Sequence, residues 1–309
     1  MSSTATHFSE EGGNVQESHS KEPLPSTLQC SDCTHSVRFV SKTLPVRVVT
    51  MSERHLVRLR MWLGRRAFKD LGSSGLCRFG PQTVLKFTST TRFSEAANME
   101  FIASHTRIPV PRVHDVFIID RRTYIVMEYI HAPELTKVWG KLTAAEKEGI
   151  FVQLKSFITQ LRSLESPHPG RVEAADGSGV FDCRLYMGSR PFSTIDEFHT
   201  QLGHRSLCAL EMYREHWPLI EAMGQKHYRT VFTHSDISPR NILVKDGSIL
   251  AIIDWECSGW FPEYWEYTRW ADSNFRSPQM WLDKRDEILD VYTSELLIES
   301  LLDSVYTRL

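Results

Sequence analysis

An Asp246-Gly247 pair between two short apolar runs is the feature that most constrains the fold of this chain. Asp-Gly is typical of the two-residue turns that join antiparallel strands, and the flanking runs, ILV and ILAII, are rich in β-branched residues. The sequence therefore predicts a β-hairpin. If the turn centres on this pair, Asn241 faces Ile252 and Asp254 lies just beyond the second strand. Both polar side chains then emerge at the open end of the hairpin.

The loop before the hairpin contains His234-x-Asp236-x-x-x-x-Asn241, and Asp254 follows Asn241 by thirteen residues. These residue types at these spacings indicate a phosphoryl-transfer site of the kinase type. An ionised Asp254 can bridge Mg²⁺ to phosphates, and Asn241 can offer a neutral oxygen to a second metal ion. Asp236 and His234 are the predicted catalytic-loop residues. Asp236 can accept or orient the proton of an acceptor hydroxyl, whereas His234 is expected to organise the loop through hydrogen bonds.

This segment resembles the aminoglycoside phosphotransferase and choline kinase-like family, whose members are small-molecule relatives of the protein kinases. HSDISPRN looks like the H-x-D-x-x-P-x-N loop of the family, IIDWE looks like its metal-binding strand, and CSGWFPEYWEY is similar to its fungal form. The resemblance covers about residues 70 to 300. It implies an α+β, bilobal, protein-kinase-like fold with a small β-rich N-lobe, a larger mainly helical C-lobe and ATP in the cleft. No A-P-E-type segment follows Asp254, which disfavours a protein kinase.

Three domains are expected along the chain. Residues 1–45 are rich in Ser, Thr, Glu, Gly and Pro and poor in apolar residues, which predicts a disordered leader. Residues 46–130 are expected to form the N-lobe and residues 131–309 the C-lobe. Cys30-x-x-Cys33 in the leader lacks the further ligands of a zinc site and the strand-to-helix setting of a redox motif. We therefore expect these two cysteines to carry no metal or redox function.

Nucleotide-binding residues are predicted in the N-lobe. Lys86 lies in VLKF, an otherwise apolar strand, and a lysine there needs an anionic partner unless it snorkels at a sheet edge. Glu95 opens a predicted helix and resembles the family glutamate that pairs with this lysine. Glu128, Tyr129 and Ile130 are expected to form the hinge between the lobes, where backbone groups recognise adenine.

Two further N-lobe segments are less specific. Residues 71–75, LGSSG, are small enough for backbone amides to approach phosphates, although they are not a G-x-G-x-x-G loop. Residues 53–69 have a basic amphipathic pattern, so they could lie on a membrane surface or an anionic partner, or pack on the first lobe with their arginines in water. The apolar positions at helical spacing are Leu56, Leu59, Trp62 and Leu63.

The acceptor substrate is expected near residues 165–230 and the segment that follows Asp254. That segment could receive a cationic or aromatic alcohol through ion pairs and cation–π contacts. Alternatively, its aromatic residues brace the C-terminal helices and its acids cap or pair locally. The interleaved acidic and aromatic residues are Glu256, Glu263, Glu266 and Asp272, with Trp255, Trp260, Tyr264, Trp265 and Trp270. Residues 283–303 are predicted to form a helix near the end of the chain.

Composition narrows the function classes. The net charge of −2 over 309 residues does not suggest nucleic-acid binding. No apolar run approaches the roughly 18–20 residues that span a bilayer, so no stable membrane insertion is expected. Six cysteines in a chain of this length do not indicate a disulfide framework. We therefore expect a cytoplasmic protein with reduced thiols, whose oligomeric state the sequence does not indicate.

These observations predict an ATP- and Mg²⁺-dependent phosphotransferase that acts on a hydroxyl of a small molecule. A pseudokinase-like module that binds nucleotide without turnover is the alternative. The chemical competence of the five key polar positions argues against this alternative, whereas the weak phosphate loop favours it. A metal hydrolase built on His234 and Asp236 lacks the additional His/Asp cluster that such a site needs.

Overall fold

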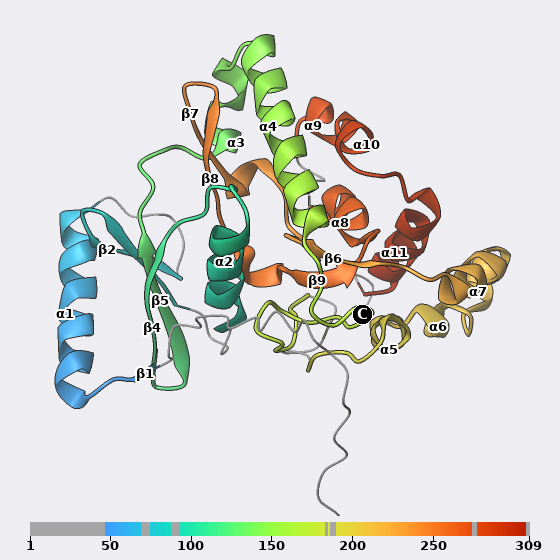
Figure 1. Ribbon diagram of the computed structural model, residues 1–309, viewed down its shortest axis with the longest axis horizontal. Coiled ribbons are helices and arrows are strands. Elements are labelled where there is room, and N and C mark those ends of the chain that lie inside the picture. The colour runs from blue at the N-terminus through green and yellow to red at the C-terminus, as the bar shows by residue number, and fades with distance from the viewer. Residues whose placement is uncertain are drawn as a thin grey trace, which may run out of the picture. The chain divides into compact units, whose positions relative to one another are not determined.

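The computed structural model describes residues 47–68, 75–87, 93–182, 185, 190–273 and 277–306. The chain divides into two compact units, residues 1–39 and 40–309, and every element below belongs to the second. Figure 1 shows that this unit contains a sheet-based lobe and a mainly helical lobe. The predicted phosphate loop, except Gly75, lies outside the described residues, as does the predicted leader.

The N-lobe is built on a five-stranded sheet in the order β1-β4-β5-β3-β2. Strands β1 and β4 pair in parallel, and the remaining neighbours pair antiparallel. Asp120 and Arg121 both have positive φ, which suits the tight turn between β4 and β5. The strands are β1 (Arg47–Val48), β2 (Leu76–Gly80), β3 (Thr83–Phe87), β4 (Val113–Ile119) and β5 (Arg122–Glu128).

Different helices cover the two faces of this sheet. Helix α1 (Met51–Ala67) packs on the face that carries Leu85, and helix α2 (Phe93–His105) packs on the face that carries Val84. Adjacent strand residues therefore point to opposite helices, as the strand period of two requires. Helix α1 begins with a Thr50–Glu53 capping box.

The C-lobe combines helices with two short β-pairs. Its antiparallel pairs are β7 (Ile242–Lys245) with β8 (Ser248–Ile252), and β6 (Thr230–Thr233) with β9 (Gly259–Pro262). Its longer helices are α4 (Ala144–Ser163), α5 (Ile195–Leu202), α7 (Trp217–Gln225), α8 (Trp265–Ser273) and α11 (Thr293–Tyr306). Its short helices are α3 (Leu135–Val138), α6 (His204–Leu207), α9 (Gln279–Asp283) and α10 (Arg285–Ile288), with 3₁₀ turns η1 (Trp139–Lys141), η2 (Glu211–His216), η3 (Pro239–Asn241) and η4 (Trp255–Cys257).

The predicted hairpin is confirmed, with one correction to its register. Asp246 and Gly247 both have positive φ, as a tight two-residue hairpin turn requires. A register shift between Leu243 and Val244 then places Ile242, not Asn241, opposite Ile252. A β-bulge adds one residue to one strand, which a count outward from the turn cannot include.

The prediction of one continuous helix over residues 283–303 is wrong, because the structure has two helices there. Helix α10 ends at Ile288, and Leu289 is extended before α11 begins at Thr293. The extended residue allows both Ile288 and Leu289 to be buried, although neighbouring side chains on a helix point about 100° apart. Packing therefore overrides the helical pattern here.

One hydrophobic core joins the two lobes. Val84 and Ile102 from the N-lobe belong to the same buried cluster as Leu154, Ile242 and Trp255 from the C-lobe. A second cluster lies within the C-lobe around Phe198 and Trp265. The prediction of a bilobal α+β fold, with a small β-rich lobe and a larger helical one, is confirmed. The exact domain boundaries stay predictions.

Candidate active site

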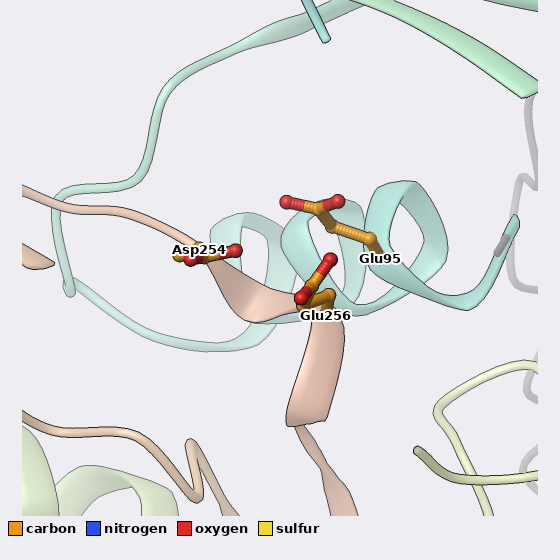
Figure 2. Close-up of side chains that lie close together, drawn as sticks. All are labelled: Glu95, Asp254 and Glu256. Carbon is orange, nitrogen blue, oxygen red and sulfur yellow. The ribbon is translucent and has the colours of Figure 1, made fainter. Parts of the chain in front are cut away.

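Lys86 on β3 contacts carboxylates from both lobes. Its Nζ lies 2.8 Å from Oε1 of Glu95 on α2 and 2.6 Å from Oδ1 of Asp254. Oε2 of Glu256, on η4, lies 3.4 Å away. Figure 2 shows Glu95 reaching from α2 toward Asp254 and Glu256, which come from one short segment. We call Glu95, Asp254 and Glu256 the carboxylate cluster.

The carboxylate cluster is held in place by mutual electrostatics. Burial favours the neutral amine of Lys86, but the three carboxylates outweigh burial and raise its pKa. Burial also raises the pKa of Glu95, to about 7, despite the adjacent ammonium. Burial acts in the same direction on Asp254, but there the charge and the hydrogen bond of Lys86, together with His234 and Arg240, outweigh burial and hold the pKa below its ordinary value. One ammonium therefore faces more negative charge than it can balance.

Asp254 is presented to this cluster by an unusual backbone conformation. Its φ of 67° and ψ of 59° lie in the left-handed region, which is strained for a residue with a Cβ atom. The next residue, Trp255, is fully buried, and its indole N–H donates to the carbonyl of Ile252 at 2.9 Å. Buried packing on one side of Asp254 therefore holds the bend that turns its carboxylate toward Lys86.

The catalytic loop brings Asp236 and Asn241 into direct contact. Asn241 Nδ2 donates to Asp236 Oδ2 at 2.8 Å and to the Asp236 carbonyl at 2.9 Å. Arg240 Nη2 lies 2.7 Å and 2.9 Å from the two carboxylate oxygens of Asp236. The donors thereby fix the Asp236 carboxylate, and the amide oxygen of Asn241 is its atom suited to a cation.

His234 connects the catalytic loop to the segment that carries Asp254. Its Nδ1 accepts the backbone N–H of Asp236 at 3.2 Å, so the ring proton belongs on Nε2. Nε2 lies 3.1 Å from the carbonyl of Ile253 and donates to it. His234 is fully buried, which agrees with the expected organising role.

Glu266 supports the backbone of the catalytic loop. The sequence left open whether this acid meets the acceptor or pairs locally, and it is buried on α8. Its carboxylate accepts the backbone N–H of His234 at 2.7 Å and that of Ser235 at 3.1 Å. Burial raises its pKa, although these amides and His234 act in the opposite direction. Glu266 is 32 positions from His234 and 31 from Ser235, so no local sequence pattern reveals these contacts.

The aromatic residues after Asp254 brace the C-lobe. Glu263 pairs with Arg229 at 2.8 Å, and the side chain of Asp272 lies outside the described residues. The alternative of structural bracing is therefore confirmed for these aromatics, and exposed cation–π recognition by them is excluded. The fully buried ones are Trp255, Trp260, Tyr264, Trp265 and Trp270.

A cavity of about 720 Å³ lies beside Lys86 and Asp254. This volume is within the usual range for small-molecule sites, roughly 300–1,000 Å³. The predicted hinge residues Glu128, Tyr129 and Ile130 all line it. Gly75, at the end of the predicted phosphate loop, lines it as well.

The hinge backbone is partly committed to the protein itself. The N–H of Glu128 donates to the Arg112 carbonyl at 2.8 Å, and the N–H of Tyr129 donates to the Gln82 carbonyl at 2.9 Å. The guanidinium of Arg78 lies 3.5 Å from the centre of the Tyr129 ring. These contacts hold the hinge against β2, the β2–β3 turn and the residue before β4.

Asn98 is a further residue that sequence reasoning missed. It is fully buried on α2, and its Nδ2 donates to the carbonyls of Trp255 at 3.2 Å and Ser258 at 2.8 Å. Its Oδ1 accepts the N–H of Ala175 at 2.9 Å. Asn98 therefore fastens the helix that carries Glu95 to the segment that carries Asp254.

The structure thus brings each predicted catalytic, metal-binding and lysine-pairing residue, and the predicted hinge, into one of two neighbouring groups. The first surrounds Lys86 at the cavity, and the second is the catalytic loop, which His234 joins to Ile253. In the described part of the chain, no helix is both long and apolar enough to cross a membrane.

Comparison with curated protein sequences finds no match. Among solved structures, a thermostable mutant of aminoglycoside phosphotransferase APH(4)-Ia in its apo form is 14% identical, with a TM-score of 0.49, covering 80% of this chain and 93% of that one. The gentamicin complex of APH(2")-IIa is 14% identical, with a TM-score of 0.48 and coverage of 84% and 87%. Macrolide 2'-phosphotransferase MphH from Brachybacterium faecium is 17% identical, with a TM-score of 0.44 and coverage of 76% and 81%.

A family model described as "Phosphotransferase enzyme family" matches residues 80–285. The match begins at the end of β2 and ends in α10, so it includes both groups of site residues. It covers well over half of the chain. The similarity to the fungal form of the family stays a prediction. The chain belongs to the phosphotransferase enzyme family.

Proposed function

We propose that this protein is an ATP- and Mg²⁺-dependent phosphotransferase that phosphorylates a hydroxyl group of a small molecule. One observation carries the proposal. Lys86 and Asp254, 168 residues apart in the sequence, meet at 2.6 Å beside a cavity of nucleotide-compatible size. A phosphate-binding lysine and a metal-binding carboxylate at one wall of a cleft are the parts that a kinase-type site requires.

The chemistry of the carboxylate cluster fits a magnesium ion. Ligand atoms of Glu95, Asp254 and Glu256 all lie within 4.8 Å of one another. Hard carboxylate oxygens are the protein ligands that Mg²⁺ prefers, and a second cation would balance the charge that Lys86 cannot. Asp254 and Asn241 would hold the metal, with Glu256 close enough to assist. When bound, Mg²⁺ supplies neutralisation of the charge on the nucleotide phosphates.

The N-lobe residues would bind and orient the nucleotide. Lys86 would exchange its contact with Asp254 for a phosphate oxygen while Glu95 keeps the ammonium in position. The backbone of Glu128, Tyr129 and Ile130 would receive the adenine. These assignments follow from the way in which all five residues border the same cavity.

Asp236 would act on the acceptor. As the acceptor oxygen bonds to the γ-phosphorus and the bond to ADP breaks, the hydroxyl proton passes to the Asp236 carboxylate. Asn241 and Arg240 hold that carboxylate in place, and His234 fixes its backbone. Catalysis then rests on positioning and charge neutralisation, without a covalent enzyme intermediate.

A panel of small molecules tests the proposal. The protein is incubated with ATP, Mg²⁺ and separate pools of amino alcohols, sugars and aminoglycosides, and products are read by mass for the gain of one phosphate. We expect one class to be phosphorylated, with no product when Asp236→Asn replaces the wild type. Nucleotide binding with neither product nor ADP from any pool would instead favour the binding-module alternative.

A further inference from the structure

Helix α1 carries an apolar stripe that points away from its own sheet. Figure 1 shows α1 at the left edge of the view, outside the sheet. Val57 and Gly64 form its buried face. The stripe residues are about half exposed: Leu56 55%, Leu59 51%, Trp62 53% and Leu63 48%. The amphipathic pattern therefore does not serve to pack α1 on the N-lobe.

The outward direction of the stripe is fixed by Gly64. A Cβ atom at this position would lie 1.8 Å from the carbonyl oxygen of Arg78, so only glycine allows the helix to sit this close to β2. Rotating α1 to bury the stripe would bring leucine or tryptophan to that contact. Helix α1 also precedes residue 80, where the family match begins, so the stripe is not a feature of the matched region.

Arginines surround and interrupt this stripe. Helix α1 contains five arginines and one glutamate, whereas the whole chain has a net charge of −2. Arg54 and Arg58 reach Asp120 at 3.0 Å and 3.4 Å at one edge. Arg66 lies within the stripe, with its guanidinium 4.8 Å from the centre of the Trp62 ring. The outer face of α1 is therefore both apolar and cationic.

We propose that α1 is a peripheral membrane-binding helix that lays this outer face on an anionic phospholipid bilayer. Leucine and tryptophan enter the boundary between headgroups and acyl chains, and arginines contact the lipid phosphates. Leucine and tryptophan on one face with arginines along its edges and within it is the composition of helices that lie in the interface plane of a membrane. The stripe spans a single helix face, so α1 lies on the membrane and does not cross it.

Vesicle sedimentation with the full-length protein tests this inference. We expect binding to vesicles that contain phosphatidylserine, weaker binding to pure phosphatidylcholine, and weaker binding at high salt. Leu59→Ser and Leu63→Ser should each weaken binding about tenfold, because each removes a leucine side chain from the lipid contact. Arg66→Gln should weaken binding to anionic vesicles about fivefold.

The matched control removes exposed apolar side chains elsewhere. Val152→Ser on α4 combined with Leu297→Ser on α11 should bind vesicles like the wild type, since both residues are exposed but lie outside α1. Thermal melting confirms that every variant is folded. Equal binding by wild type and stripe variants would overturn the inference, as would no binding at all. So would a vesicle-free dimer that the stripe variants convert to monomers, because a second copy would then occupy the stripe.

Discussion

Glu95 is a site residue whose ionisation is strongly altered by burial. Its pKa in the folded protein is about 7, against 4.5 for an ordinary glutamate. Between these pH values the folded state binds more protons than the unfolded state, so the free energy of unfolding falls as the pH rises. Above a pH of about 7 the carboxylate is ionised in both states, and the stability that the protonated carboxyl contributed at lower pH is lost.

Glu95→Gln should remove this pH dependence. The variant side chain is neutral throughout, so relative to the wild type it should gain on the order of 1 kcal/mol of unfolding free energy from about pH 5 to about pH 8. Urea denaturation across this range measures the difference. Glu165→Gln, on an exposed segment, is the control and should show no such gain. If the free energy of unfolding depended on pH in the same way for Glu95→Gln and the wild type, the raised pKa of Glu95 would be contradicted.

Asp236→Asn should preserve nucleotide binding and lose phosphoryl transfer by roughly 10²-fold or more, because an amide cannot accept the acceptor proton. Calorimetry with ATP and Mg²⁺ measures binding, and ADP release in the presence of an acceptor measures transfer. Retained turnover would show that another group takes the proton.

Single residues also show what the sequence could reveal. The resemblance to the family implied a contact between Lys86 and Glu95, which the structure places at 2.8 Å. Glu256 was expected near the acceptor, and its contact with Lys86 was missed. The role of Glu266 was also missed, since nothing near it in the sequence indicates that its carboxylate accepts two backbone amides of the catalytic loop.

At the scale of elements, the β7–β8 hairpin shows both the reach and the limit of local patterns. The turn and the strands follow from Asp246, Gly247 and the apolar runs beside them. The bulge does not, because its cost and benefit depend on the surrounding packing. Its effect is that Ile253 donates its N–H to the Asn241 carbonyl at 2.9 Å, so Asp254 follows directly after this pair.

The hairpin predicts coupled effects of its two proposed metal ligands. Asp254→Ala should abolish Mg²⁺-dependent ATP binding, whereas Asn241→Ala should weaken it less, because only the carboxylate contributes charge. Because Asp254→Ala already removes Mg²⁺-dependent binding, adding Asn241→Ala should cause no further loss, so the two effects should be non-additive. Calorimetry with and without Mg²⁺ measures ATP binding by the wild type, the two single variants and the double variant. Wild-type affinity for MgATP in Asp254→Ala would place the metal elsewhere.

Helix α2 predicts a strong stability effect at Asn98. Asn98→Ala leaves the carbonyls of Trp255 and Ser258 and the N–H of Ala175 without this partner. At about 1–3 kcal/mol for each buried group, the loss should be at least about 3 kcal/mol. Chemical denaturation measures it, and Gln160→Ala, whose hydrogen bonds are exposed, serves as control. A loss near zero would mean that water replaces the side chain.

At the scale of the whole molecule, the shared core predicts cooperative unfolding of residues 75–306. Val84 in the sheet and Leu154 in α4 belong to one buried cluster, so unfolding of either lobe exposes part of the core that the other lobe packs against. Hydrogen exchange should therefore give the same opening free energy for the most protected amides of β5 and α4. A clearly lower value for β5 would show that the N-lobe opens by itself.

The contacts of Asn98 also decide which parts of the protein can move apart. Helix α2 precedes the hinge in sequence, yet Asn98 ties it to the backbone of residues 175, 255 and 258. A motion that widens the cleft would thus draw the sheet away from the segment that carries Asp254, and the ion pair between Lys86 and Asp254 spans that gap. Admission of a nucleotide and separation of this pair become one displacement, so the length of a single ion pair would report how far the enzyme is open.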